Sequence, residues 1–561
     1  PIVKVSKGKH EKSFYNLTDY DNWKETEDTN GFAIKYYKGL GTSTNKEAKE
    51  YFKNMKLVNY VWGDGSDERI ELAFNKKRAD DRKQWLYSYD KQVILETNLT
   101  DKMSSVTYSD FVDKELIHFS NYNVERSIPN LCDGLKLSLR KILFCCIKRN
   151  LYKEIKVAQL AGYVSEHGAY HHGEASLHDA IIGMAQTFVG SNNINLLSPN
   201  GQFGTRIQGG KDSASPRYIH TELNKIVPFI FHPDDLDILE YTYEDGQKTE
   251  PIHYIPIIPM ILVNGTSGIG TGFSTNIPAY NPKDIISNLE RLMNNEEMVT
   301  MEPWYSGFKG ENSCGISRGV FRKTTKTKVE ITELPVGYWT EDFKSYLEDY
   351  MDKHPKTLKD YESHYTEKDV KFTLHFTSSD VLDALLEHDA DKKCSKLETE
   401  FKLCSTRPLN TTNMHLYSSQ GKIQKYACVL DIMKEFYTTR LHMYGRRKQY
   451  KIEKLGNELK FIDSRIKFIT DIINNDLVVN NAKKQDIIDY LTTNEFPMHD
   501  ESFDYLLKLP LYNLTFEKKQ ELENDRELKM TVVGTLESKL EKELWSEDLA
   551  ELLKQYNKHN K

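Results

Sequence analysis

The sequence predicts a multidomain α+β protein that ends in a long pair of helices. Its length of 561 residues exceeds what one hydrophobic core normally serves, so we expect roughly three or four domains. Strand-like runs alternate with amphipathic helical segments through residue 426. From Ala427 onward, apolar residues recur at three- and four-residue steps, which predicts a helix of roughly 45 residues with a coiled-coil-like seam.

Composition narrows the class of protein. The hydrophobic share of 39% and the charged share of 28% are typical of a globular protein. No apolar run reaches the roughly 18 residues that indicate a membrane-spanning helix, so we expect no membrane partner. Seven cysteines without a CxxC pair indicate reduced thiols rather than a zinc site or a disulfide framework. The chain opens on the strand-like PIVKVSK without a methionine, and we expect it to be part of a longer polypeptide.

Residues 1–104 and 281–426 each combine strand and helix patterns. Residues 1–104 combine short strand-like runs with polar loops and end in the helical pattern LAFNKKRADDRKQWL. In residues 281–426, KVEITELP and DVKFTLHF predict strands, and EDFKSYLEDYM predicts an amphipathic helix. The second region therefore predicts an α/β platform beside the core.

Residues 105–280 begin with a basic helix. In DGLKLSLRKILFCCIKRN we expect Asp133 to cap the helix, and Lys136 and Arg140 to share one exposed face with Lys141 nearby. The expected buried face comprises Leu139, Ile142, Leu143, Cys146 and Ile147. Two more helical patterns and glycine-punctuated strand segments follow, which predicts a winged-helix arrangement.

The charge of this region points to nucleic acid. The whole chain carries a net charge of −7, but positions 126–156 hold eight basic residues against two acidic ones. A local excess of cations of this kind favours contacts with DNA phosphates, which do not discriminate between base sequences. The alternative interpretation is a basic helix face that is only exposed to solvent.

The segment GQFGTRIQGGKDSASPRYI, residues 201–219, contains the candidate nucleophile. Tyr218 follows directly on Arg217, downstream of a loop rich in glycines, hydroxyls and cations. Because a tyrosine phenol has a pKa near 10, it attacks a phosphodiester only when it is positioned and faces an electrophile whose charge is neutralised. Arg217 can supply that neutralisation. One of 33 tyrosines is more often a packing residue, so the pair alone does not decide the chemistry.

The glycine-rich GTSGIGTG, residues 265–272, places Ile269 in a flexible loop. This side chain can tuck into the core, or it can wedge between base pairs and bend a duplex. A nucleotide-binding loop is disfavoured, because the strand–loop–helix context and an acidic partner are missing.

Two long helices occupy the C-terminal quarter. The first begins near Ala427, and the second is expected from about Thr515 to Lys542, with Leu522, Leu528, Leu536 and Leu540 on it. A small helical insert between them predicts an antiparallel pair with a globular tip, although an ordinary bundle has the same pattern.

Long collinear motifs give the chain a family resemblance. It resembles the type IIA DNA topoisomerases of eukaryotic type, which include those of some large DNA viruses, over nearly its whole length. The motifs include PIVKVSK, KYYKGLGTSTNKEAKEYF, ERSIPNLCDGLK, YHHGE, GQFGTRIQGGKDSASPRY, YIPIIPMILVNGTSGIGTGFS and YLLKLPLYNLTFEKKQELE.

The resemblance implies four domains. It places the C-terminal part of a Toprim α/β domain and a linker at 1–104, and a winged-helix domain with the catalytic tyrosine at 105–280. It places an α/β tower at 281–426, and an antiparallel coiled coil with a helical C-gate tip at 427–561. The tip would join a homodimer, since Leu506, Leu507, Leu509 and Leu511 are too apolar to be left in water.

The resemblance also implies roles for individual residues. Tyr218 would form a transient 5′-phosphotyrosyl bond to one strand of double-stranded DNA, and Arg217 would stabilise the transition state. Arg126 matches an arginine close to the nucleophile, and one residue of the pair His171 and His172 would contact the scissile phosphate. The implied DNA contacts are Lys38, Lys136, Arg140, Lys141, Gln159, Thr205, Lys211 and, as a wedge, Ile269. Leu137 and Leu139 replace a proline and a glutamine of the family pattern, which puts the role of that glutamine in doubt.

Two implied cofactors have no site in this sequence. The family binds Mg²⁺ through acidic EGDS-type and DxD-type Toprim motifs that normally lie upstream of PIVKVSK, and the resemblance assigns no metal ligand to this sequence. We expect these motifs, and the ATP-binding module, upstream of Pro1. A nuclear enzyme is expected, with a viral enzyme in the cytoplasm as the alternative. The rival function is a non-catalytic DNA-bending dimer or scaffold.

Overall fold

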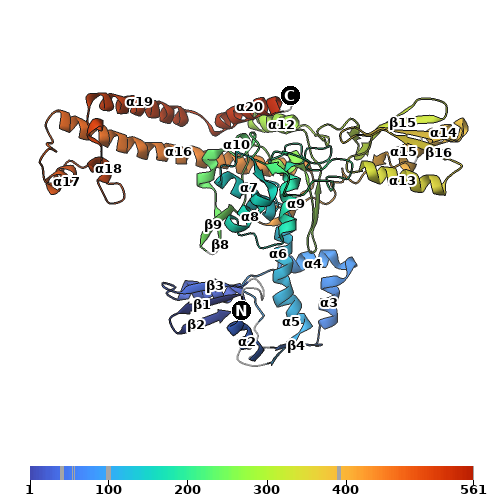
Figure 1. Cartoon of the computed structure of the whole chain (residues 1–561), viewed down its shortest axis with the longest axis horizontal. Coiled ribbons are helices and arrows are strands. Elements are labelled where there is room, and N and C mark those ends of the chain that lie inside the picture. The colour runs from blue at the N-terminus through green and yellow to red at the C-terminus, as the bar shows by residue number, and fades with distance from the viewer. Residues whose placement is uncertain are drawn as a thin grey trace.

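The computed structural model describes residues 1–37, 43–53, 55, 57–95, 103–244, 246–387 and 393–559. A central body carries three extensions (Figure 1): an N-terminal part, a lobe that contains a sheet, and a long two-helix arm on the opposite side from that lobe. None of the described helices is long and apolar enough to cross a membrane. All seven cysteines are free thiols.

The N-terminal part holds an antiparallel sheet covered by a helix. Val3 and Val5 alternate with polar residues and bury one face of the central strand against Phe14, Tyr20 and Trp23. The sheet order is β2-β1-β3, and β4 pairs with β5 in parallel. The elements are β1 (Val3–Lys7), β2 (His10–Phe14), α1 (Leu17–Thr26), β3 (Ala33–Tyr36), α2 (Asn45–Lys53), β4 (Leu57–Val61) and β5 (Met103–Thr107).

A helical segment joins this part to the central body. The predicted LAFNKKRADDRKQWL helix is two helices separated by a 3₁₀ turn. Leu72, Trp85 and Val124 pack in one cluster with Phe273 of the central body. The elements are α3 (Ser66–Phe74), η2 (Lys76–Arg78), α4 (Ala79–Tyr87), α5 (Tyr108–Phe111), the π-helical turn η3 (Val112–Leu116) and α6 (Ile117–Ser127).

The central body packs three helices against short strands and hairpins. Ile142, Leu143 and Cys146 are fully buried as predicted, whereas Leu139 and Ile147 are partly buried. The elements through the β8–β9 hairpin are α7 (Leu137–Lys148), β6 (Ile155–Lys156), α8 (Val157–His167), α9 (Glu174–Ala185), β7 (His220–Thr221), α10 (Val227–Ile230), η4 (Pro233–Ile238), β8 (Tyr241–Glu244) and β9 (Gln247–Pro251). They are followed by α11 (Met260–Asn264), β10 (Thr266–Ile269), β11 (Ser274–Ile277) and α12 (Pro282–Met293).

The sheet-containing lobe is built on the antiparallel order β14-β15-β17-β16. Val329, Ile331, Phe372 and Leu374 alternate along the two central strands and pack on the helix that contains Phe343. The elements are β12 (Glu311–Ser313), β13 (Ile316–Arg318), β14 (Val320–Lys323), β15 (Lys328–Glu333), α13 (Thr340–Lys353), β16 (Leu358–Ser363), β17 (Phe372–Phe376), α14 (Ser379–Leu386), α15 (Lys396–Glu400) and β18 (Cys404–Ser405). The following strands β19 (His415–Tyr417) and β20 (Ile423–Lys425) form a hairpin that packs on the central body.

The arm confirms the predicted 45-residue helix. It comprises α16 (Val429–Ile473), α17 (Lys484–Thr493), α18 (Asp504–Leu507), η5 (Leu511–Asn513) and α19 (Phe516–Ser538), followed by α20 (Glu541–His559). α19 runs beside α16, with α17 and α18 at the far end (Figure 1). The second helix ends at Ser538, before the predicted Lys542, because Lys539 leaves the helical conformation with a ψ of 140°.

Burial along the arm departs from the prediction in two places. No side chain of α19, which is described throughout, is fully buried, and Leu528 and Leu540 are exposed. Two helices side by side cannot enclose each other's apolar residues as a bundle would. At the tip, Leu506 is buried in the chain's own core and Leu507 and Leu509 pack against it, so only Leu511 of the predicted four is left 84% exposed.

Candidate active site

Tyr218 lies on the surface at the N-terminal end of α8. Hydrogen bonds from Val157 N to Ile219 O and from Ala158 N to Pro216 O, both 3.1 Å, fix the loop to that end. Ile219 is buried, and β7 pairs with β6 directly after it. The Tyr218 side chain is nevertheless 77% exposed, and Arg217 is exposed beside it. A rigid backbone therefore presents an accessible phenol and a guanidinium to solvent.

The glycine-rich loop upstream of Tyr218 is held by Asp212. Thr205 N donates to Asp212 Oδ1 at 2.8 Å, and the Thr205 hydroxyl donates to Asp212 Oδ2 at 2.5 Å. Thr205 is buried and its hydroxyl is bound to that carboxylate, and its role as a DNA contact stays a prediction. Lys211 is exposed on the loop, and Gln159 is exposed in the first turn of α8.

The histidine pair follows the other end of α8. His171 Nε2 lies 2.9 Å from Glu244 Oε2, and His172 Nε2 lies 2.7 Å from the Tyr122 hydroxyl. Burial, together with the charges of Arg126, His171 and Lys141, holds the pKa of His172 below its usual value. His172 is therefore a neutral imidazole near pH 7, placed within the field of Arg126.

One helix separates the two groups of predicted catalytic residues. Tyr218 and Arg217 lie at the N-terminal end of α8, and His172 follows its C-terminal end. A helix of 11 residues is roughly 16 Å long. The sequence did not predict that α8 separates Tyr218 from His172.

Two predicted DNA contacts, Arg140 and Lys141, form buried ion pairs in this structure, and their contact with DNA stays a prediction. Arg140 donates to Asp133 at 2.7 Å, and Lys141 Nζ lies 2.9 Å from Glu250 and from Glu244. Both cations are buried, so the prediction that they lie on an exposed face is wrong. The helix-cap prediction for Asp133 is also wrong, because its carboxylate binds Arg140 and a backbone N–H group of a distant segment, and Lys136 takes the cap position. Buried charges require such partners.

Lys136 and Ile269 meet at the β10–β11 hairpin. Lys136 Nζ donates to Ser267 O at 2.8 Å, and burial lowers the pKa of the Lys136 amine. Ile269 ends β10 with its side chain 83% exposed, so the alternative in which it tucks into the core is wrong. The predicted contact Lys38 lies outside the described residues.

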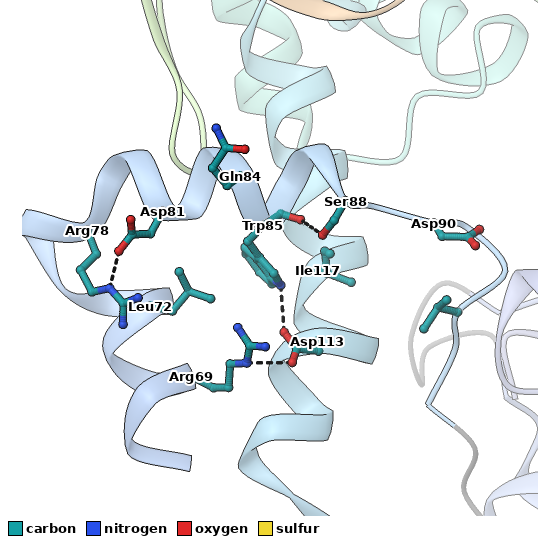
Figure 2. A pocket seen from close by; sticks show the side chains of 11 residues that line it. Arg69, Leu72, Arg78, Asp81, Gln84, Trp85, Ser88, Asp90, Asp113 and Ile117 are labelled. Carbon is teal, nitrogen blue, oxygen red and sulfur yellow. Dashed lines mark hydrogen bonds and ion pairs between the residues drawn. The ribbon is translucent and has the colours of Figure 1, made fainter. Parts of the chain in front are cut away.

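A cavity of about 420 Å³ lies elsewhere, between α3, α4 and α6 (Figure 2). Four of its charged side chains form two ion pairs: Arg69 with Asp113 at 2.9 Å, and Arg78 with Asp81 at 2.6 Å. Trp85 closes one wall and donates to Asp113 at 3.1 Å. The lining residues include none of the predicted catalytic residues.

Comparison with known proteins places these features in a family. A family described as the A-type subunit of DNA gyrase/topoisomerase IV matches residues 126–550, and one described as the C-terminal associated domain of TOPRIM matches residues 1–124. The chain belongs to the type II DNA topoisomerase family. Its mixed helix and sheet architecture agrees with the predicted α+β class.

Relatives in this family are similar along the whole chain. DNA topoisomerase 2 of Plasmodium falciparum is 43% identical over 98% of this chain, and that of Arabidopsis thaliana is 43% identical over all of it. The chain spans 41% of each of these relatives. A crystal structure of the P. falciparum topoisomerase II DNA-binding, cleavage and re-ligation domain matches with a TM-score of 0.83 at 43% identity, covering all of this chain and 79% of that one.

The Mg²⁺ implied by the family resemblance finds no ligand set here. Within the described ranges, no three His, Cys, Asp or Glu side chains come together as metal ligands. The described residues therefore do not fit the ion.

Sequence reasoning missed the groups that hold the predicted site residues. Asp212 fixes the loop before the nucleophile, and Tyr122, Asn123 and Glu244 contact the histidines and the Ile269 hairpin. Asp212 was detectable in principle, since it lies six residues before Tyr218 in the same motif. Tyr122 and Glu244 lie 50 and 73 residues from their partners, beyond any local pattern.

Proposed function

We propose that the chain is the DNA breakage–reunion core of an ATP-dependent type IIA topoisomerase, with Tyr218 as its nucleophile. The observation that carries this proposal is the Arg217–Tyr218 pair, which is exposed on a backbone pinned to α8. The Tyr218 hydroxyl gives up its proton as its oxygen bonds to phosphorus, the bond from phosphorus to O3′ breaks, and the 3′ oxygen takes up a proton, so that no net proton is gained or lost. The 5′-phosphotyrosyl linkage conserves the bond energy, so the reverse attack reseals the strand.

In this proposal Arg217 has one role, and Arg126 and His172 beyond the other end of α8 have another. The Arg217 guanidinium neutralises charge on the attacked phosphate. Arg126 and the neutral His172 bind a scissile phosphate and the leaving oxygen. The separation of the two groups by α8 supports assembly of each site from two copies, so that a homodimer cuts both strands of a duplex at staggered positions.

Domain roles are part of the same proposal. Residues 105–280 act as a winged-helix DNA-binding domain, residues 281–426 as a tower, and residues 427–561 as a coiled coil that ends in a dimer gate. Residues 1–104 are the C-terminal part of a Toprim domain and a linker, which the match to the C-terminal associated domain of TOPRIM supports. Passage of a second duplex through the cut changes DNA supercoiling and linkage, and the eukaryotic relatives support a nuclear location.

A covalent-adduct assay tests the nucleophile. The chain is incubated with nicked duplex DNA and Mg²⁺, and protein-linked DNA is resolved on a denaturing gel. We expect Tyr218→Phe to bind DNA within a few-fold of the wild type and to form no adduct. Tyr243→Phe, which alters another exposed tyrosine, should form adduct normally. An adduct that persists in Tyr218→Phe would rule out this nucleophile.

The alternative function is a non-catalytic DNA-bending dimer or scaffold. The exposed Ile269 favours it, because an apolar wedge bends DNA without any chemistry. Retarded but never covalent wild-type complexes in the same assay would support this alternative for the chain.

A further inference from the structure

Tyr122 on α6 holds His172. The Tyr122 hydroxyl and His172 Nε2 are 2.7 Å apart, and the two rings stack with centroids 6.1 Å apart at an interplanar angle of 29°. Tyr170 contacts the same imidazole edge-on, at 5.4 Å between centroids. One hydroxyl and two ring contacts thus fix the imidazole relative to α6.

Asn123, the next residue of α6, holds the hairpin that carries Ile269. Its Oδ1 accepts hydrogen bonds from Thr271 N at 2.9 Å and from the Thr271 hydroxyl at 3.2 Å. The hairpin also lies directly on the helix backbone. A Cβ atom at Gly268 would lie 2.3 Å from Ser127 O, so only glycine permits this approach.

The helix and the hairpin share one core. Val124 of α6 is buried in the same cluster as Phe273, which closes the hairpin turn. Because a close-packed core shifts as a unit, displacement of the hairpin also displaces α6. Successive helix residues project about 100° apart, so Tyr122 and Asn123 can face different partners from one turn.

We propose that Tyr122 and Asn123 are positioning residues that link the DNA-bending hairpin to the histidine of the cleavage site. Asn123 transmits the position of the Ile269 hairpin to α6, and Tyr122 transmits the position of α6 to His172. In this proposal the Tyr122 hydroxyl donates to Nε2, and the neutral ring then carries its proton on Nδ1. A duplex bent by Ile269 therefore changes the placement of His172. This inference rests on the proposed function, since it assumes that the hairpin and His172 engage the same DNA.

The first arm of the test reads the His172 tautomer in the full chain without DNA. Imidazole nitrogen chemical shifts are measured by NMR and assigned with His172→Gln. In the wild type we expect Nε2 to be unprotonated. Tyr122→Phe keeps the ring contacts and removes only the hydroxyl, so it should convert the ring to the Nε2–H form. An unchanged spectrum in Tyr122→Phe overturns the role of Tyr122.

The second arm measures bending by energy transfer between dyes at the ends of a short duplex, at saturating protein. Asn123→Ala removes the acceptor of two hydrogen bonds, and we expect the ratio of bent to straight DNA to fall about tenfold. Asn123→Asp keeps an acceptor oxygen and should retain bending, as should Tyr122→Phe. A duplex with a flexible central mismatch should restore bending to Asn123→Ala.

The third arm joins the two readouts. Saturating duplex should shift the His172 signals of the wild type, and the shift should be much smaller in Ile269→Ala and Asn123→Ala. Equal shifts in all three proteins, or wild-type bending by Asn123→Ala, would overturn the link. Failure of the wild type to bind or bend DNA would instead count against the proposed function, while the tautomer arm remains independent of it.

Discussion

At the scale of single residues, burial separates cations that look alike in the sequence. Arg217 is exposed next to Tyr218, whereas Arg140 is enclosed with Asp133 and Lys141 with Glu250. An exposed guanidinium is available to a phosphate, while a buried one already has its counter-charge, and removing that carboxylate would leave an unpaired charge inside the protein.

The Asp133–Arg140 pair predicts a large loss of stability on neutralisation. Asp133→Asn should lower the free energy of unfolding by roughly 3–5 kcal/mol, because Arg140 stays charged and buried. Denaturant unfolding followed by circular dichroism measures it. Asp369→Asn, which breaks the exposed pair with Lys309, is the control and should unfold like the wild type. Equal stability of both variants would contradict the structural role of Asp133.

The lowered pKa of His172 predicts a specific response to Arg126. Burial is the first cause of the shift and the charge of Arg126 the second, so Arg126→Gln should raise the pKa of His172 partway toward 6.5. An NMR titration measures the change. The folded chain binds the His172 proton less readily than the unfolded chain does. The neutral imidazole therefore contributes to the free energy of unfolding above pH 6.5, and this contribution is lost as pH falls through the pKa of the folded state. If the pKa of His172 stays the same or falls in Arg126→Gln, the charge of Arg126 does not act on His172 as the structure predicts.

At the scale of elements, the central body is tied to the arm by aromatic packing on α16. Trp545 of α20 is fully buried and stacks on Tyr437 and Tyr444, with centroids 5.4 and 5.6 Å away. Its Nε1 donates to Ile257 O in the central body at 3.0 Å. This single side chain therefore joins α20, α16 and the body.

Truncation of Trp545 should loosen this junction. We expect Trp545→Ala to cost about 3–5 kcal/mol in unfolding free energy, since it leaves a large cavity and an unpaired carbonyl. Hydrogen exchange should locate the loss in α20 and the adjoining part of α16. Trp62→Ala, at an exposed site, serves as the matched control. Unchanged exchange in α20 would show that the junction does not depend on this ring.

At the scale of the whole molecule, the extensions place different surfaces far apart. The arm and the sheet-containing lobe leave the central body in opposite directions (Figure 1). At the end of the arm, Leu511 and Tyr512 are the most exposed apolar residues, and Val478, Met498 and Phe516 are exposed as well, whereas Leu506 and Phe503 are buried in the tip's own core. Leu511 and Tyr512 are therefore candidates for the contact between two copies in the proposed homodimer.

The tip predicts how the chain self-associates. Leu511→Asp should weaken the proposed homodimer by about tenfold or more, because it places a charge in an apolar contact. Analytical ultracentrifugation over a concentration series measures the effect. Leu528→Asp, on a side chain of α19 that is 69% exposed, should leave association unchanged. Equal behaviour of the two variants would move the dimer contact away from the tip.

The sequence by itself determined the elements and the candidate nucleophile. Periodicity located α16, and the exposed Arg217–Tyr218 pair stood in one contiguous motif, because both signals are local in the chain. Only the tertiary structure decided which cations are free and how the site is supported. Glu250 is 109 residues from Lys141, and Tyr122 is 50 residues from His172. Helical spacing shows which residues share a face, but burial and pairing depend on what the fold packs against that face.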